Sequence, residues 1–190
     1  MTTPIVRAVC AAAMAFAATT ALAQESTNRV ATKTDWSVFI EGSPQECWGV
    51  SSPKESVNSR NGQPVSVRRG DTLLFVTFRP GSGARGEVSF TGGYPFADGS
   101  TVKMNIDGTT YDLRTADEWA WPTSAEAESA TSPEAAAAAT AAADAALLAA
   151  MKRGTTAILS AASGRGTETK DTFSLRGFTA AMEEAETRCK

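Results

Sequence analysis

The chain has 190 residues with three cysteines and no histidine, and its formal net charge is −3 at pH 7. The absence of histidine removes the most common general base and the most common zinc ligand, and the acidic balance disfavours a protein that must contact many nucleic-acid phosphates. We therefore expect no metal, no cofactor and no nucleic-acid partner.

The first 23 residues have the pattern of an export signal. Arg7 precedes an apolar stretch at residues 8–18 that is too short to anchor in a bilayer, and the small residues before Gln24 suit signal peptidase. Cleavage after Ala23 would leave 167 residues with a net charge of −4, because the signal contains one arginine and no acid. Cys10 lies at the start of the apolar run, which argues against lipid attachment. We also expect that no later segment could span a membrane as a transmembrane anchor.

Residues 24–34 are polar and aperiodic, and we expect a flexible mature N-terminus there, followed by a single domain at residues 35–190. Ser, Asn, Gly and Pro gather at residues 51–64, which predicts a loop. Strand-forming residues predict strands in the first half of the domain at residues 36–40, 46–50, 72–78 and 87–91.

A two-residue hairpin is predicted at Asp107-Gly108, which lies between two alternating apolar and polar runs. This register places Lys103 opposite Asp112 on the polar face. On the apolar face it pairs Ile106 with Thr109, Met104 with Tyr111 and Val102 with Leu113.

A long helix is predicted from Ser132-Pro133-Glu134, an N-cap with a first-turn proline, to the basic residues before Gly154. Its alanine-rich N-terminal part belongs to a low-complexity insert at about residues 125–143, which we expect to be exposed. The bulky residues that would dock it lie at its C-terminal end, namely Leu147, Leu148 and Met151.

Two more strands, at residues 155–160 and 167–175, precede a final helix whose apolar stripe contains Phe178, Ala181, Met182, Ala185 and Cys189. Many strands with few parallel crossovers predict an α+β fold: a mainly antiparallel β sandwich or open barrel with an Ala-rich helix and a C-terminal helix. In an oxidising compartment Cys47 and Cys189 are expected to form a structural disulfide rather than a metal or redox site.

The sequence offers little for catalysis. Gly81 to Gly86 fits a dinucleotide-binding pattern, but a strand follows where a helix is required. The nearest carboxylate pairs are Asp107 with Asp112 and Asp117 with Glu118, and a turn, a lysine partner and a solvated loop explain them better than acid–base catalysis. We expect no catalytic residues, although a Ser-Lys arrangement is not visible in sequence alone.

Four side chains form the candidate binding surface: Tyr94, Trp119, Trp121 and Arg79. Tyr94 and Trp121 each precede a proline and are expected in loops, where side chains more often meet a partner. The four tryptophans, Trp36, Trp48, Trp119 and Trp121, offer flat apolar faces for sugars or protein side chains. Core packing is the alternative for the tryptophans. Arg68, Arg69, Arg79 and Arg85 either form a basic patch or lie on a solvated strand face.

From about Asp35 to the end the chain resembles the invasion-associated locus B family, small exported proteins of alphaproteobacteria. The resemblance rests on the following residues: Trp36, Cys47-Trp48, Arg69-Gly70, Phe78-Arg79-Pro80, Gly93-Tyr94-Pro95, Ala150 to Gly154, Asp171 to Phe178, and Cys189. The Ala-rich stretch before Leu147 looks longer than the family pattern. The resemblance implies a periplasmic or surface protein, linked in pathogenic members to host-cell entry, and implies no catalytic residues.

We therefore expect a non-enzymatic exported protein that binds an envelope or host-surface component. Two alternatives stay open: an envelope hydrolase that uses carboxylate or Ser/Lys chemistry, and a structural protein needed for envelope integrity.

Overall fold

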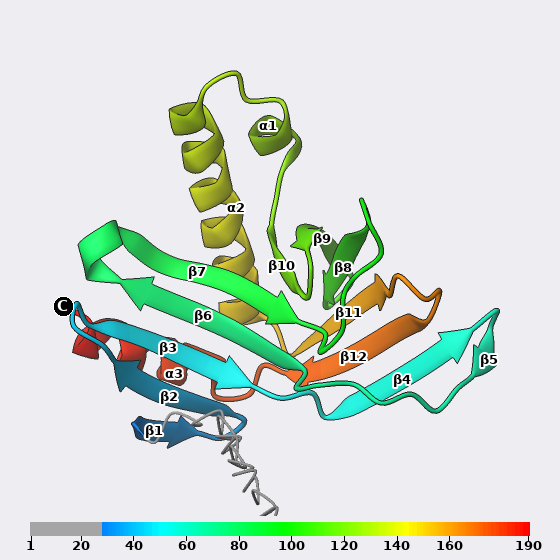
Figure 1. Cartoon of the computed structure of the whole chain (residues 1–190). Coiled ribbons are helices and arrows are strands. Elements are labelled where there is room, and N and C mark those ends of the chain that lie inside the picture. The colour runs from blue at the N-terminus through cyan, green and yellow to red at the C-terminus, as the bar shows by residue number, and fades with distance from the viewer. Residues whose placement is uncertain (1–27) are drawn as a thin grey trace, which may run out of the picture.

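The computed structural model describes residues 28–190 (Figure 1). The expected signal peptide and residues 24–27 lie outside the described residues. Sixteen elements follow in chain order: β1 Arg29–Lys33, β2 Trp36–Glu41, β3 Glu46–Ser51, β4 Glu55–Arg60, β5 Gln63–Pro64, β6 Leu73–Arg79, η1 Pro80–Ser82, β7 Ala84–Thr91, β8 Thr101–Ile106, β9 Thr109–Ala116, β10 Trp119–Pro122, α1 Ala125–Glu128, α2 Pro133–Arg153, β11 Thr156–Ala162, β12 Glu168–Ser174 and α3 Phe178–Arg188.

All twelve strands belong to one antiparallel sheet, in the spatial order β1-β2-β3-β6-β7-β10-β9-β8-β11-β12-β4-β5. The sheet is open, because β1 and β5 are its two edges. The expected α+β fold with a mainly antiparallel sheet is thus confirmed in its open form. Because only three residues separate β3 from β4, the chain crosses directly from one half of the sheet to the other (Figure 1).

Helix α3 covers one face of the strands β1, β2, β3 and β6 (Figure 1). Its buried residues are those of the predicted stripe, and Phe178 packs edge-on against Trp36 with 4.8 Å between the ring centres. Gly49 on β3 lets the helix approach closely, since a Cβ there would overlap the methyl group of Met182. The core extends below α2 through Phe90 and Phe173, which are fully buried.

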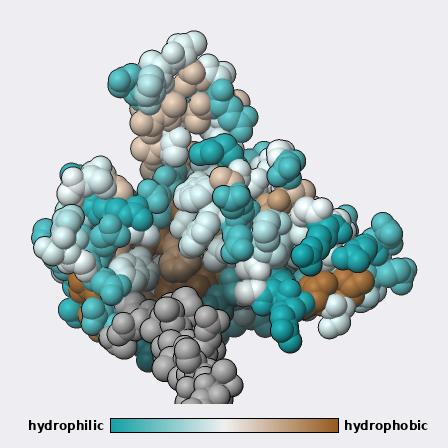
Figure 2. Space-filling model, viewed as in Figure 1, coloured by the Kyte–Doolittle hydropathy of each residue, from teal (hydrophilic) through white to brown (hydrophobic). Residues whose placement is uncertain are grey.

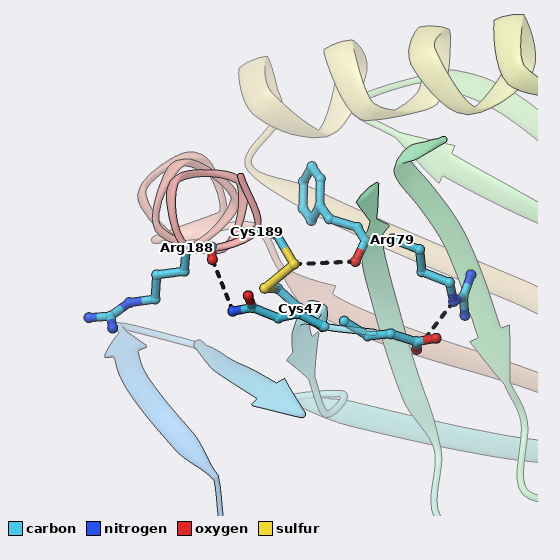
Figure 3. The surroundings of a disulfide bond; sticks show 7 residues. Cys47, Arg79, Arg188 and Cys189 are labelled. Atoms are coloured by element: carbon cyan, nitrogen blue, oxygen red, sulfur yellow. Dashed lines mark hydrogen bonds and ion pairs between the residues drawn. A yellow bond between two sulfur atoms is a disulfide. The ribbon is translucent and has the colours of Figure 1, made fainter. Parts of the chain in front are cut away.

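A disulfide joins β3 to the residue after α3, as predicted: Cys47 and Cys189 are bonded, with 5.9 Å between their Cα atoms (Figure 3). Beside the bond, Gln45 donates a hydrogen bond from Nε2 to the carbonyl oxygen of Arg188 at 3.0 Å. The Cys189 sulfur lies 3.5 Å from the carbonyl oxygen of Phe78 on β6. The C-terminus is therefore held against two neighbouring strands.

The predicted hairpin and long helix are confirmed. Strands β8 and β9 pair in the predicted register, and Lys103 Nζ lies 2.8 Å from a carboxylate oxygen of Asp112. The Ser132 hydroxyl accepts a hydrogen bond from the Ala135 amide at the start of α2. At its other end Leu147 and Met151 are fully buried.

Two expected loops are strands instead. The loop predicted at 51–64 contains the hairpin β4–β5, which turns at Asn61-Gly62, both with positive φ. The flexible segment predicted at 24–34 contains β1, which pairs with β2. Both strands are mostly polar and show no apolar alternation, with Val30 on β1 and Val57 on β4 exposed. Pairing orders them, β1 with β2 and β4 with β12 and β5.

Helix α2 projects away from the sheet and packs beside α1 (Figure 1). By length and composition alone it could cross a membrane, with a mean hydropathy of 1.3 over its best window. This corrects the expectation that no segment after the signal could span a membrane. Alanine supplies most of the apolar character, and the bulky residues face the protein core.

Candidate functional site

Five aromatic side chains lie on the sheet face opposite α3, and we call this set the aromatic face: Phe39, Trp48, Phe75, Trp119 and Trp121. Side chains alternate along a strand, so the burial of Cys47 and Gly49 against α3 directs Trp48 to the other side. The same alternation places Trp119 and Trp121 outward around the buried Ala120.

The aromatic rings form two groups, one on β2 and β3 and the other on β6 and β10. Phe39 and Trp48 stack nearly parallel, with centres 5.7 Å apart. Phe75 lies 5.8 Å from Trp119, which stacks on Trp121 at 6.3 Å. Trp119 is 38% exposed and the other four rings are half-buried. Such offset arrangements hold each ring in place while leaving one surface open.

A groove of about 410 Å³ is lined by Trp48, Phe75, Trp119 and Trp121. A second hollow, of about 710 Å³, shares Trp48 and Phe75 with it and continues toward β2. Figure 2 shows hydrophobic residues gathered in a hollow over β6 on this face. Within residues 28–190 no helix lies over this face, because α2 and α3 pack on the other one.

Arg79 lies at the border of the same groove, so the structure brings together three of the four residues of the candidate surface: Arg79, Trp119 and Trp121. The guanidinium pairs with Glu46 at 3.2 Å and with Glu87 at 3.1 Å. Figure 3 shows the Arg79 side chain on the face away from α3. The predicted basic contribution is therefore offset by two acids, and the border of the groove is polar rather than cationic.

Tyr94 lies at a different place, after β7, in a network around a buried ion pair. Arg69 donates from Nη1 and Nη2 to the two carboxylate oxygens of Asp171 at 2.8 and 2.7 Å. Asp171 is fully buried, and Ser56 adds a hydrogen bond to it at 2.6 Å. The Arg69 guanidinium lies 5.1 Å from the centre of the Tyr94 ring, within cation–π range.

The phenol of Tyr94 shares a 2.6 Å hydrogen bond with the hydroxyl of Thr169. Burial raises the pKa of Tyr94 above its ordinary value of about 10, against the opposing effects of Thr169 and Arg69. The phenol therefore stays protonated at neutral pH. The preceding glycine, Gly93, has φ +71°, and its carbonyl oxygen accepts a hydrogen bond from the amide of Gly70 at 2.8 Å.

Arg69, Tyr94 and Asp171 belong to three separate segments that carry the family resemblance, and the fold brings these segments into one network. This part of the arrangement was not predicted. Arg69 was expected on a basic patch or a solvated face, but its side chain is only 9% exposed. Asp171 sits in an alternating strand between buried positions, a signal that could have marked it as an inward-facing acid needing a partner.

The two acids of the first carboxylate pair make separate structural contacts. Asp107 accepts hydrogen bonds from the amide and the hydroxyl of Thr155, each at 2.9 Å, which lower its pKa. Asp112 pairs with Lys103. A further acid was missed: burial raises the pKa of Asp144 on α2 to about 6, although it accepts a hydrogen bond from the Val88 amide at 2.8 Å.

Trp121 was expected in a loop, and this was wrong, because residues 119–122 form β10 between β7 and β9. Pro122 closes that strand, which is why the sequence favoured a loop. Trp48 was considered as a flat platform but not included in the candidate surface, and Phe75 was missed. Their alternation with the buried neighbours Cys47 and Val76 was the available signal.

Fold and site together define a class: a disulfide-closed, mainly antiparallel sheet domain with helices on one face and exposed aromatic residues on the other. The chain belongs to the invasion associated locus B (IalB) family, whose model matches residues 36–186. Among solved structures it is similar to invasion associated protein B from Bartonella henselae, at 14% identity and a TM-score of 0.48, over 83% of this chain and 96% of that chain. Among curated proteins no relative matches.

Proposed function

We propose that this IalB-family protein is an exported, non-enzymatic binding protein that contacts an envelope or host-surface component through its aromatic face. One observation carries the proposal: five large rings lie half-buried or exposed on a sheet face that no helix of residues 28–190 covers. Tryptophan and tyrosine dominate the binding energy of many interfaces because each buries about 150–250 Å² and loses little conformational freedom.

The groove suits a partner with both apolar and polar groups. Trp48, Phe75 and Trp119 offer apolar surfaces, while Glu46, Arg79 and Glu87 border them with charged groups already held in ion pairs. A flat ring surface beside hydrogen-bonding groups fits sugar rings as well as protein side chains. The family name refers to invasion, and binding to a host-cell surface is the form in which that role would apply to this chain.

Export is supported by the disulfide, because such bonds persist in oxidising compartments and are rare in the cytosol. The signal pattern at residues 1–23 supports it as well. Both features support a location in the periplasm or at the cell surface. The proposal that the protein is not an enzyme is supported by the contacts of one candidate carboxylate pair. Asp107 accepts a hydrogen bond from Thr155 and Asp112 pairs with Lys103, so both acids have structural partners.

The test is a binding measurement with matched variants. Purified mature protein, labelled at its C-terminus, would be incubated with envelope membranes of its own cell and separately with host-cell surfaces. We expect saturable binding to one of them that falls by about tenfold or more in Trp119→Ala/Trp121→Ala, since hot-spot aromatic residues each contribute about 2 kcal/mol.

The control is Val57→Ala, which removes another exposed apolar side chain, 44% exposed on β4, from the far end of the sheet. It should bind like the natural protein. Equal losses in both variants, or no saturable binding to either surface, would contradict the proposal. Thermal unfolding of each variant establishes that the fold is retained.

A further inference from the structure

We propose that a pocket beside Tyr94 binds an oxyanion, a phosphate or carboxylate group carried by a small solute or by a sugar. We call it the arginine pocket: a cavity of about 550 Å³ whose lining includes Arg60, Arg68, Arg165, Tyr94 and Glu118. It lies apart from the groove of the aromatic face, so the proposal does not depend on the proposed function.

The first argument is charge. Arg60 ends β4, Arg68 lies in the segment before β6, and Arg165 lies in the β11–β12 connection. These three exposed arginines line one cavity of a chain with net charge −3. Within residues 28–190 none of them has an acidic group within ion-pair distance, and Glu118 is the only acid in the described lining. Like charges gathered in this way repel one another until an anion joins them.

The second argument is chemistry. A guanidinium carries five N–H donors in a planar fork that matches two oxygens of a carboxylate or phosphate. Such charge-assisted, bidentate contacts are stronger than neutral hydrogen bonds. Arg60 uses one nitrogen to donate to the Thr167 hydroxyl at 2.8 Å and keeps its other donors for a ligand.

The third argument is rigidity. Tyr94 forms part of the wall, fixed by Thr169 on one side and by the Arg69 guanidinium on the other. Asp171 accepts two hydrogen bonds from Arg69 and neutralises its charge. The Arg69 guanidinium therefore stabilises the wall and is not available to the ligand. A prearranged pocket loses less entropy when it binds. The Arg60 bond to Thr167 and the buried ion pair supply that arrangement.

The test is a nuclear magnetic resonance titration of the isotope-labelled mature protein. Inorganic phosphate, glucose 1-phosphate and galacturonate would be added in separate series at constant ionic strength. We expect saturable shifts of the arginine Nε–Hε signals and of the amides near Gly164 and Tyr94. The first ligand reports a free phosphate, and the other two report a phosphate or a carboxylate carried by a sugar.

In Arg68→Gln/Arg165→Gln the affinity should fall by about tenfold or more, because two charge-assisted contacts are lost. The matched control is Arg114→Gln, which removes an exposed arginine of β9 outside the pocket and should change the affinity less than about twofold. The proposal is overturned if none of the three ligands gives saturable shifts, if the double variant binds as well as the natural protein, or if Arg114→Gln loses as much.

Discussion

Arg69 and Asp171, 102 positions apart in the chain, form a doubly hydrogen-bonded ion pair in the protein interior. Arg69 also donates from Nε to the carbonyl of Gly92 at 2.9 Å, so one side chain connects the segment before β6 to the end of β7 and to β12. Strands β7 and β12 are not neighbours in the sheet, so Arg69 connects two parts that no strand pairing joins directly.

Breaking this pair should cost stability. Asp171→Ala leaves the buried guanidinium without its counter-charge, and we expect the free energy of unfolding to fall by about 3–5 kcal/mol in urea titrations. Lys103→Ala breaks an exposed pair and should cost less than about 1 kcal/mol. Equal effects of the two substitutions would show that the Arg69 contact is not the structural connection described here.

The disulfide should contribute strongly because it closes most of the domain. Its cysteines are 142 positions apart, and chain-entropy reasoning gives about 5 kcal/mol as an upper estimate. Reduction, or the variant Cys47→Ala/Cys189→Ala, should lower the free energy of unfolding. Hydrogen exchange should then rise first in α3, since the helix loses its covalent attachment to β3. Unchanged protection of α3 after reduction would contradict this.

Asp144 predicts a pH dependence of stability. Its pKa is about 6 in the folded protein against 3.8 ordinarily, so the folded state holds a proton more tightly than the unfolded state between those values. The free energy of unfolding should therefore fall as the pH rises through this window and stay lower above it. The main cause is burial, and the nearby Glu87 charge adds to it.

Asp144→Asn should remove this dependence. The amide oxygen can still accept the hydrogen bond from the Val88 amide and carries no charge to desolvate. Because the group is partly exposed, we expect a gain of about 1–2 kcal/mol at pH 8. The gain should vanish below pH 4, which serves as the internal control in chemical unfolding at several pH values. A gain of equal size at all pH values would mean that charge is not its origin.

Gly93 should tolerate no side chain. Its φ is +71°, and a Cβ there would overlap the backbone of Gly70 beside the Tyr94 network. Gly62 has a similar φ of +74° with nothing within 4 Å, so it is a matched control. Gly62→Ala should cost about 1 kcal/mol from backbone strain alone, and Gly93→Ala distinctly more. If thermal unfolding shows equal losses of stability in the two variants, the close approach of Gly93 to Gly70 is not the cause of the loss in Gly93→Ala.

The sequence predicted those parts of the fold whose signals are local. The β8–β9 register follows from Asp107-Gly108 and from alternation on both faces, and α2 follows from its cap and its alanines. Strands β1 and β4 were missed because they are mostly polar and show no apolar alternation, so only pairing with neighbouring strands orders them. Strand β10 was missed because Pro122 suggested a loop.

Only part of the candidate site was predicted, because its assembly depends on contacts between distant segments. Trp119, Trp121 and Arg79 meet in one groove as the candidate surface required, whereas Tyr94 belongs to the arginine pocket. Trp48 joins Trp119 only through the order of the strands, which residue spacing does not give. The partnership of Arg69 with Asp171 likewise depends on contacts between distant segments, and a single sequence holds no record of them.

The central claim is that the aromatic face meets a partner in the cell envelope or at a host surface. A photo-crosslinking amino acid at position 119, with position 57 on β4 as the control, measures this directly in living cells. We predict discrete cross-linked products at position 119 that are absent at position 57. Products that are identical at both positions, or none at position 119 under conditions where the protein is exported and folded, would contradict the account.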